Sequence, residues 1–372
     1  MKIHLSSPDI TDLEIQYVTE VLKTRNLSLG PMLGKFESAF AERVGSKYAV
    51  AVNSGTSGLH LVVRALGIGE GDVVITTPFS FISSANCMLF ERARPLFVDI
   101  DEDTMNIDPK KIKEAMEGLD KPPKAILPVH VFGYPCDMDA IMEIADSNGM
   151  AVIEDSCEAL GTEYKGRMVG TLGNAGVYAF YPNKQITTGE GGMIVTDDPE
   201  IAALSKSMRN QGRGETGGWF AHERLGYNYR ISDVSCAIGL AQIERLGEIV
   251  AKRKRVAEFY RERLSDVAGL ILPPGYDEKR MSWFVYVVRL GADYSRKDRE
   301  RVLTGLRAAG IGCNNYFSPI HLQPFYKEMF GFTEGDFPVT EAVADRTIAL
   351  PFYNDLGEGD LDTIAEKLRE LL

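Results

Sequence analysis

The chain has 372 residues, which exceeds the usual size of a single hydrophobic core, so two domains are expected. Its 44% hydrophobic and 25% charged residues are typical of a globular protein with a sizeable core. The net charge of −12 argues against a general nucleic-acid binder, which would show a basic surface. It does not exclude a phosphate-bearing small ligand, because surface charge beyond about 8 Å is screened.

The cysteines are few and widely spaced, with no CxxC pair. They are Cys87, Cys136, Cys157, Cys236 and Cys313. We therefore expect neither a disulfide framework nor a metal site, and a reducing compartment. The start of the chain lacks the apolar region of a signal peptide, and no stretch approaches the roughly 20 apolar residues of a membrane span. We expect a cytoplasmic protein with no nucleic-acid or membrane partner.

From residue 48 onward, short β-rich runs alternate with helical runs, which indicates a mainly parallel sheet wrapped by helices. The expected strands are 48–53, 71–78, 94–100, 124–131, 150–157, 176–182 and 192–197. The helical runs between them are 57–66, 82–90, 108–118 and 137–149. We assign residues 13–250 to this large domain.

A long helix is predicted from Ser232 to about Leu264, because Ser232 is a good helix start and apolar residues recur at helical spacing. A strand at 283–290 follows, then helices at 296–310 and 359–372. We interpret residues 251–372, together with 1–12, as a smaller α+β domain.

The segment from Phe180 to Gly192 places one lysine, Lys184, between a proline-containing turn and a glycine-rich run. Gly189 and Gly191 allow unusual φ angles and close backbone approach. A lysine amine forms a Schiff base with an aldehyde when it is unprotonated, which requires a partly desolvated or cationic setting. The alternative is an ordinary surface lysine in a glycine-rich loop.

The second candidate is Asp155, at the end of the apolar strand predicted at 150–157. Ligands of open α/β sheets bind at the carboxyl ends of the strands. A carboxylate there can keep a pyridine nitrogen protonated, so that the ring becomes an electron sink. Glu154 points to the opposite side of the strand and is the weaker candidate. The alternative is an aspartate that caps a helix or lies in a loop.

The third candidate is the run of small residues from Asn53 to Gly58, which follows a strand and opens a helix. Free N–H groups and the positive end of the helix dipole at Gly55 and Thr56 form a natural phosphate cradle. The run is not a Walker motif and not GxGxxG. The alternative is simple helix capping by Ser54 or Thr56.

Phe81 follows the next predicted strand and is placed to stack on a flat ring, although aromatic residues more often belong to the core. The order of the signals is more informative than any one of them. A phosphate cradle, an aromatic residue, a strand-end aspartate and a lysine about 30 residues further on follow one another. These are the contacts that pyridoxal 5'-phosphate (PLP) requires.

With these residues in view, the chain resembles the DegT/StrS family of fold-type-I PLP enzymes, the sugar aminotransferases of antibiotic, O-antigen and glycan biosynthesis. The resemblance covers almost the whole chain and includes VNSGTSGLHL, GDVVITTPFSFISSAN, PVHVFGYPCDMD, IEDSCEALG, FYPNKQITTGEGG and LGYNYRISDVSCAIGLAQIERL. The lysine block and the GYNYR block are highly specific to the family. The resemblance implies a fold-type-I α/β transferase, with a large domain and a smaller C-terminal α+β domain.

Position by position, the resemblance implies that Lys184 carries PLP as a Schiff base and then acts as general acid and base. It implies that Asp155 partners the pyridine nitrogen and that Phe81 stacks on the ring. Gly55 and Thr56 match the phosphate-binding turn.

The resemblance also implies a homodimer with shared active sites, because Asn228 matches an asparagine that reaches the cofactor phosphate of the neighbouring subunit. Tyr316, His321 and Arg230 are candidates on the substrate side. His321 is equally well explained as a structural histidine.

Two positions depart from the family pattern. Ala179 stands where a serine often binds the phosphate, so one hydroxyl donor is lost. Glu158 stands where a glutamine is often near the phenolic oxygen of the ring. A carboxylate there repels a phenolate unless it is protonated.

The implied reaction moves an amino group from L-glutamate, the donor that the resemblance suggests, to a keto group of a nucleotide-linked sugar. The nucleotide is left open between UDP, dTDP and GDP, and the keto group between carbon 3 and carbon 4. One alternative is a PLP-dependent sugar dehydratase, but those relatives carry histidine in place of Lys184. The other is a non-enzymatic regulator that binds PLP or another phosphorylated ligand, but no helix-turn-helix appendage or basic patch is visible.

Overall fold

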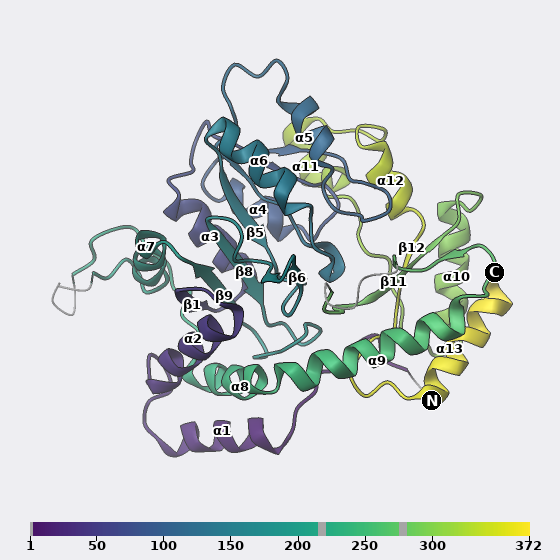
Figure 1. Ribbon diagram of the computed structural model, residues 1–372, viewed down its shortest axis with the longest axis horizontal. Helices are drawn as coiled ribbons and strands as arrows, with labels where there is room; N and C mark the ends of the chain where they lie inside the picture. The colour runs from purple at the N-terminus through teal and green to yellow at the C-terminus, as the bar shows by residue number, and fades with distance from the viewer. Residues whose placement is uncertain (1–2, 215–220, 275–280) are drawn as a thin grey trace.

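The computed structural model describes residues 3–214, 221–274 and 281–372 (Figure 1). Residues 1–2 and 275–280 of the predicted small domain lie outside these ranges. A seven-stranded sheet dominates the molecule, with the strand order β1-β9-β8-β5-β4-β2-β3. Its strands are β1 (Tyr48–Val52), β2 (Val73–Thr76), β3 (Arg94–Phe97), β4 (Ala125–Ile126), β5 (Ala151–Asp155), β8 (Ala175–Ala179) and β9 (Gly192–Thr196). Only β9 runs antiparallel to its neighbours, so the predicted mainly parallel sheet is confirmed.

Helices cover both faces of this sheet because its side chains alternate between two cores. In β1, Val50 and Val52 join one hydrophobic cluster, whereas Ala49 and Ala51 join another. The face of Val50 is covered by α3 (Gly55–Ala65), α4 (Ser83–Leu89) and α7 (Pro199–Arg209). The other face is covered by α2 (Pro31–Val44), α5 (Pro109–Met116), α6 (Met138–Asn148) and α8 (Asp233–Glu244), and α1 (Asp12–Lys23) packs on α8.

The single helix predicted from Ser232 to Leu264 is wrong, because the chain forms two helices there. The first, α8, ends at Glu244, and α9 (Leu246–Leu264) begins after Arg245, whose backbone has φ −89° and ψ 0°. The Arg245 guanidinium lies 2.8 Å from the carboxylates of both Asp9 and Glu14. These partners belong to the N-terminal segment, so the periodicity of the helix itself carried no signal for the break.

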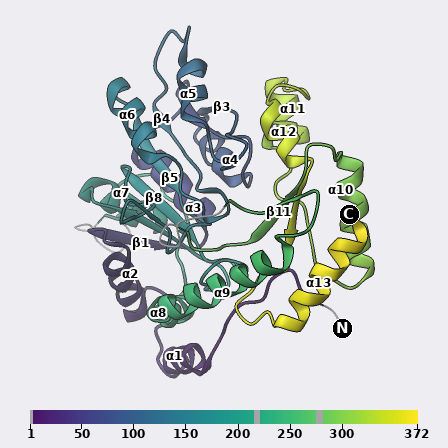
Figure 2. The ribbon, with the colours of Figure 1, turned by 45° about the vertical axis from the view of Figure 1, so that its right-hand side comes forward.

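The last third of the chain forms the predicted α+β unit beside the large sheet (Figure 2). Its antiparallel sheet consists of β10 (Leu270–Ile271), β11 (Tyr286–Leu290) and β12 (Thr347–Leu350). The helices α9, α10 (Arg296–Ala308) and α13 (Glu358–Leu371) pack with this sheet around a core of their own. Ile3 joins that core and pairs with Ile311. The exact limits of the two domains stay a prediction.

A segment between α10 and β12 returns to the large sheet. It contains η2 (Ile320–Leu322), α11 (Pro324–Phe330) and α12 (Pro338–Ala344). Ile320 and Tyr326 pack against Ala85 of α4 and Phe97 of β3. The start of this segment thereby lies close to the carboxyl ends of the parallel strands.

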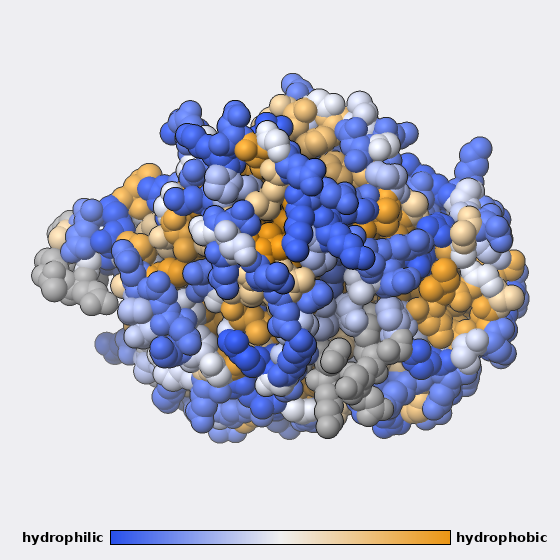
Figure 3. All heavy atoms as spheres, turned by 45° about the horizontal axis from the view of Figure 1, so that its top comes forward, coloured by the Kyte–Doolittle hydropathy of each residue, from blue (hydrophilic) through white to orange (hydrophobic). Residues whose placement is uncertain are grey.

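The remaining short elements are η1 (Val131–Gly133) and the hairpin of β6 (Glu163–Tyr164) and β7 (Arg167–Met168). On the face shown in Figure 3, hydrophilic residues dominate and hydrophobic residues appear in patches between them. Within the described ranges, no helix is both long enough and apolar enough to cross a membrane.

Candidate active site

A cavity of about 590 Å³ opens where the parallel strands end, with the α+β unit forming its other wall. This is the edge of the sheet at which α/β proteins bind ligands. Seven of the candidate cofactor and substrate residues from the sequence line it: Gly55, Thr56, Phe81, Asp155, Glu158, Lys184 and Tyr316. They come from four separate stretches of the large sheet and one of the smaller unit, which only the fold brings together.

Lys184 reaches this cavity from a tight turn, in which its backbone N–H donates to the carbonyl of Tyr181 at 2.9 Å. Its side chain is only 13% exposed, so the amine is partly desolvated. The Nζ atom lies 3.5 Å from Glu158 Oε1 and 3.9 Å from the centre of the Phe284 ring. Gly189 follows at φ +80°, which explains why the block after the lysine needs glycine.

Glu158 is buried beside the lysine. Its Oε2 atom accepts a hydrogen bond of 2.8 Å from the backbone N–H of Phe132, a residue with φ +57°. Burial raises the pKa of Glu158 above its ordinary value, although the nearby Lys184 acts in the opposite direction. The carboxylate that the sequence left in doubt therefore faces the lysine and protonates more readily than a solvated glutamate.

Asp155 ends β5 with both carboxylate oxygens engaged. Oδ2 accepts a hydrogen bond from the Ser84 hydroxyl at 2.7 Å, and Oδ1 accepts one from the Cys157 N–H at 3.1 Å. Glu154, on the other side of the strand, instead accepts bonds from three backbone N–H groups and contacts His130 at 3.0 Å. The alternation of the strand thus separates a carboxylate that faces the cavity from one that holds the fold together.

The turn before α3 has the features of an anion cradle. Ser54 caps the helix by accepting a hydrogen bond of 3.1 Å from the Ser57 N–H. The hydroxyl of Thr56 lies 2.7 Å from that of Ser83, so two hydroxyls meet at the cavity wall. A Cβ atom at Gly55 would lie 2.8 Å from the Cβ of Ala179, which excludes a larger residue. The free N–H groups of this helix start favour a phosphate.

The residues present fit PLP. Phe81 lines the cavity and is 61% exposed as a residue, which leaves an apolar face for a flat ring to cover. The buried Oδ1 atom of Asn183, also in the lining, has no hydrogen-bond partner in the described part of the chain. Such an unpaired polar atom is costly unless a ligand satisfies it.

Three residues singled out from the sequence lie elsewhere. Within the described ranges, the lining of this cavity does not include Asn228, Arg230 or His321. Asn228 is exposed, and Arg230 donates to Asn210 Oδ1 at 3.1 Å. His321 is fully buried, with Nε2 3.0 Å from Glu341 Oε1. These contacts fit the structural role for His321 that the sequence left open.

Sequence reasoning missed Ser84, Asn183 and Phe284. Ser84 lies three residues after Phe81, so one helical turn was a usable signal for it. Asn183 directly precedes Lys184, whose chemistry already accounts for the motif, so nothing in the sequence pattern distinguishes this asparagine. Phe284 comes from the smaller unit, and nothing in its local pattern separates it from a core residue.

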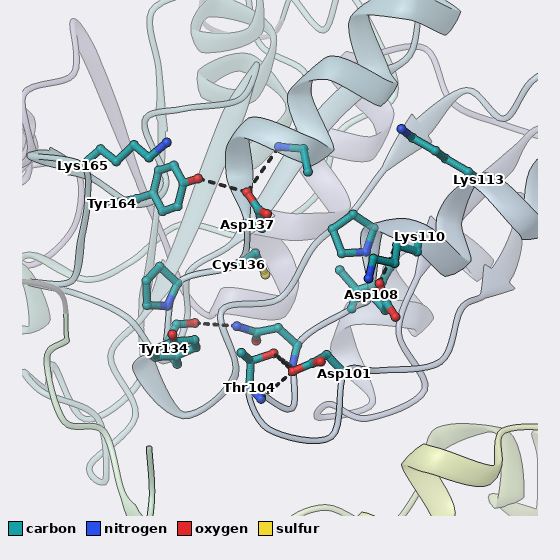
Figure 4. Close-up of a pocket in the computed structure, with 15 residues that line it drawn as sticks. Asp101, Thr104, Asp108, Lys110, Lys113, Tyr134, Cys136, Asp137, Tyr164 and Lys165 are labelled. Atoms are coloured by element: carbon teal, nitrogen blue, oxygen red, sulfur yellow. Dashed lines mark hydrogen bonds between the residues drawn. The ribbon is translucent and has the colours of Figure 1, made fainter. Parts of the chain in front are cut away.

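A second cavity, of about 630 Å³, lies beside the starts of α5 and α6 (Figure 4). Its carboxylates already have partners in the protein. Asp108 caps α5, and Asp137 caps α6 while accepting a hydrogen bond of 3.0 Å from the Tyr164 hydroxyl. Among the residues that the structure describes, the lining of this cavity contains neither an exposed aromatic residue nor a buried side-chain polar atom without a hydrogen-bond partner.

Together, the sheet, the smaller unit and the cavity with its lysine and aspartate define a transferase of fold type I. The chain belongs to the DegT/DnrJ/EryC1/StrS aminotransferase family, whose model matches residues 8–369. Family membership identifies the protein as an aminotransferase and implies dependence on PLP.

Relatives of known sequence and structure agree with this family. The chain is 40% identical to the spore coat polysaccharide biosynthesis protein SpsC of Bacillus subtilis, over 99% of this chain and 96% of SpsC. It is 38% identical to GDP-perosamine synthase of Caulobacter vibrioides, over 100% and 98% of the two chains. The structure of Helicobacter pylori PseC, an aminotransferase of pseudoaminic acid biosynthesis, matches with a TM-score of 0.93 and 27% identity, covering 100% and 99%.

Proposed function

We propose that this aminotransferase carries PLP on Lys184 and transfers an amino group from L-glutamate to a keto group of a nucleotide-linked sugar. The observation that carries the proposal is the meeting of the Lys184 amine, the Asp155 carboxylate and the exposed Phe81 ring in one cavity. The sugar substrate is supported by relatives named for GDP-perosamine and pseudoaminic acid synthesis. A dehydratase has no support here, because the residue at the anchoring position is lysine and not histidine.

When bound, PLP supplies an aldehyde that accepts an amino group and a pyridine ring that withdraws electrons. Lys184 Nζ provides the covalent anchor and, once released, takes the α-proton from the amino donor and later returns a proton on the sugar side. Asp155 provides the negative partner for a protonated ring nitrogen, and the Ser84 hydroxyl orients it at 2.7 Å. The first turn of α3 and Thr56 hold the phosphate.

We further infer a homodimer with two composite sites, in which Asn228 reaches the cofactor phosphate of the partner subunit. Two observations support it. Asn228 is exposed and does not belong to the lining of its own cavity within the described ranges. Exposed apolar side chains, including Ile15, Leu22 and Leu225, supply surface for a second copy. The phosphate needs an outside donor because Ala179 contributes no hydroxyl.

The test begins with purified protein and added PLP. We expect a visible absorbance band that borohydride removes and a covalent PLP adduct on Lys184 by peptide mass spectrometry. A panel of UDP-, dTDP- and GDP-linked keto-sugars with L-glutamate should then yield 2-oxoglutarate and an amino sugar in equal amounts. A deoxygenated sugar without an amine would identify a dehydratase. Stable PLP binding with no turnover of any sugar would favour a regulator.

The dimer is tested by mixing two inactive proteins. Lys184→Ala removes the anchor, and a bulky Asn228→Trp substitution blocks the position offered to the partner. A mixed dimer carries one intact site and one doubly damaged site, so activity should return in part. Exchanged mixed dimers without any recovery, or a fully active monomer, would show that each site is built within one chain.

A further inference from the structure

We propose that His60, Arg64 and Glu91, which we call the α3 clamp, position Asn228 for the partner subunit's active site. The inference rests on the proposed homodimer with composite sites. It assigns a role to a partly buried polar cluster that lies outside the cavity lining and has no part in the chemistry described above. The three residues act as positioning residues and not as catalytic ones.

The clamp holds the two tyrosines on either side of Asn228. The hydroxyl of Tyr229 lies 3.0 Å from His60 Nδ1, and the hydroxyl of Tyr227 donates to Glu91 Oε1 at 2.9 Å. The two tyrosine rings stack on each other with centroids 4.9 Å apart and planes 11° apart. The His60 ring packs on Tyr227 at 4.7 Å. Both neighbours of Asn228 are thereby fixed by ring contacts and by hydroxyl contacts.

Glu91 is the centre of the clamp. Its Oε1 atom lies 2.8 Å from His60 Nε2, and its Oε2 atom accepts a bond of 2.5 Å from Arg64. Burial would raise the pKa of Glu91, but the hydrogen bonds of His60 and Tyr227 and the charge of Arg64 lower it below its ordinary value. The group is thus a charged carboxylate with three partners, an arrangement that holds side chains in one geometry.

The backbone around Asn228 determines the direction in which its side chain points. Tyr227 and Tyr229 donate N–H bonds to the carbonyls of Met208 and Arg209 at 2.6 and 3.0 Å, and Asn228 between them forms an antiparallel β-bridge with Asn210. In an extended segment, neighbouring side chains point to opposite sides. Because the tyrosines point at the clamp, Asn228 points away from it, and its side chain is exposed.

The same helix serves both sites. The α3 helix starts at the phosphate turn, and His60 and Arg64 lie four residues apart on one of its faces. The carbonyls of Asn228 and Tyr229 accept bonds from the side chain and the backbone N–H of Asn53, which directly precedes that turn. In this proposal, the N-terminus of α3 binds the cofactor phosphate of its own subunit. Contacts from the same helix position the Asn228 side chain, which donates a hydrogen bond to the phosphate in the other subunit.

The test removes two hydroxyls and keeps both rings, in the double variant Tyr227→Phe with Tyr229→Phe. We expect the Kd for PLP of the homodimer to rise about tenfold, because two hydrogen bonds that fix the Asn228 segment are lost. The readout is borohydride-stable PLP on Lys184 as a function of PLP concentration, measured by intact mass. The matched control is Tyr164→Phe, which loses a tyrosine–aspartate bond in the second cavity and should leave the Kd unchanged.

A mixed dimer shows whether the two tyrosines affect the PLP site of the partner subunit or the PLP site of their own subunit. The double variant, which retains Lys184, is combined with a Lys184→Ala subunit whose clamp is intact. The only site that can be labelled then uses an Asn228 held by the intact clamp, so its Kd should return to the wild-type value. A Kd that stays raised in the mixed dimer would overturn the proposal, because the tyrosines would then act on their own subunit. Tyr229→Phe alone gives the same comparison if the double variant does not fold.

An Asn228→Ala subunit in the same mixed dimer distinguishes this inference from the proposed function. One outcome is that Asn228→Ala raises the Kd for PLP only at the partner subunit's Lys184 while the tyrosine variant raises it at the Lys184 of its own subunit. In that case the clamp proposal fails and the composite site stands. If Asn228→Ala leaves the Kd unchanged in the homodimer, the composite site itself is wrong and the clamp proposal fails with it. If wild-type protein places no PLP on Lys184, the proposed cofactor anchor is wrong.

Discussion

Two buried groups of carboxylates in this protein behave in opposite ways. At the junction of α8 and α9, burial acts against the ionised form of Asp9, but hydrogen bonds from Arg245, Asn354 and Lys252 outweigh it and lower its pKa to about 2. In the cavity, burial dominates and raises the pKa of Glu158 above its ordinary value.

The difference lies in how completely each charge is compensated. Asp9 has three side-chain donors, whereas Glu158 has one backbone N–H at 2.8 Å and an amine 3.5 Å away. A fully compensated carboxylate stabilises the fold. Incompletely compensated charge next to an exposed aromatic ring and an unpaired amide oxygen marks a place where a ligand acts.

The largest expected effect comes from removing the lysine side chain from the cavity. Lys184→Ala should lower amino transfer by at least about 10³-fold, because both the covalent anchor and the proton carrier are lost. Lys184→Arg should fail equally, since a guanidinium does not form the imine. The measurement is 2-oxoglutarate formation, with thermal melting as a check on the fold. The control is Lys165→Ala, which removes an exposed lysine paired with Asp139 and should be fully active. Substantial turnover by Lys184→Ala would contradict the assignment of Lys184 as the anchor.

The next effect comes from neutralising Asp155 while keeping its shape. Asp155→Asn should slow the half-reaction with L-glutamate by about 10²–10³-fold, because an uncharged partner does not stabilise a protonated ring nitrogen. Stopped-flow absorbance of the bound cofactor measures this step. Some PLP should be retained, since the anchor on Lys184 is intact. A half-reaction at the wild-type rate would place the electron-sink partner elsewhere.

Breaking the compensated group should affect stability and not the chemistry. Asp9→Asn should lose roughly 2 kcal/mol of unfolding free energy at neutral pH, from a pKa of about 2 in the folded state against 3.8. A carboxylate whose pKa is lowered in the folded state stabilises the fold at every pH above its unfolded-state pKa. This stabilisation is lost as the pH falls through its folded-state pKa. The difference from wild type should therefore shrink between about pH 4 and about pH 2 in urea unfolding.

The control for this measurement is Asp362→Asn, whose side chain is 55% exposed in an ion pair with Arg263. It should change the unfolding free energy by less than about 1 kcal/mol. Equal losses of unfolding free energy for Asp9→Asn and Asp362→Asn would show that burial and several hydrogen-bond donors do not make the Asp9 carboxylate more stabilising than an exposed one.

The smallest effect is expected at Glu158. It is a change in unfolding free energy with pH whose direction is opposite to that at Asp9. A raised pKa means that the folded state binds the proton more tightly, so burial of the carboxylate weakens the fold above the folded pKa and this penalty is relieved as pH falls. PLP-free wild-type protein should therefore gain stability relative to Glu158→Gln as the pH falls from neutral toward the ordinary glutamate pKa of 4.5. Urea unfolding at matched pH measures it. A difference that is constant across this range would mean that Glu158 titrates as it does in the unfolded chain.

Much of the cavity was predictable from the sequence for a physical reason. The turn at Gly55, the ring of Phe81 and the carboxylate of Asp155 each follow a strand, and parallel strands end at the same edge of a sheet. Lys184 follows β8, the next strand along the sheet from β5. The order of these signals along the chain therefore predicted that they meet, without any knowledge of distances.

Other features depended on contacts between distant segments. Phe284 reaches Lys184 from the smaller unit, 100 residues further along the chain, and its own strand pattern shows only that it is apolar. The end of α8 at Arg245 depends on Asp9, which is 236 residues away. The position of Asn228 depends on His60 and Glu91 through its tyrosine neighbours.

By itself, the sequence determined the alternation of strands and helices, the two regions and the residues most suited to hold PLP, because these depend on local periodicity and on residue types in order. The tertiary structure decided which carboxylates are compensated, where the long helix breaks and which side chains face the cavity. Burial and hydrogen-bond donors set those outcomes, and the donors come from segments far apart in the chain. The same residue type therefore stabilises the fold at Asp9 and faces the reactive lysine at Glu158.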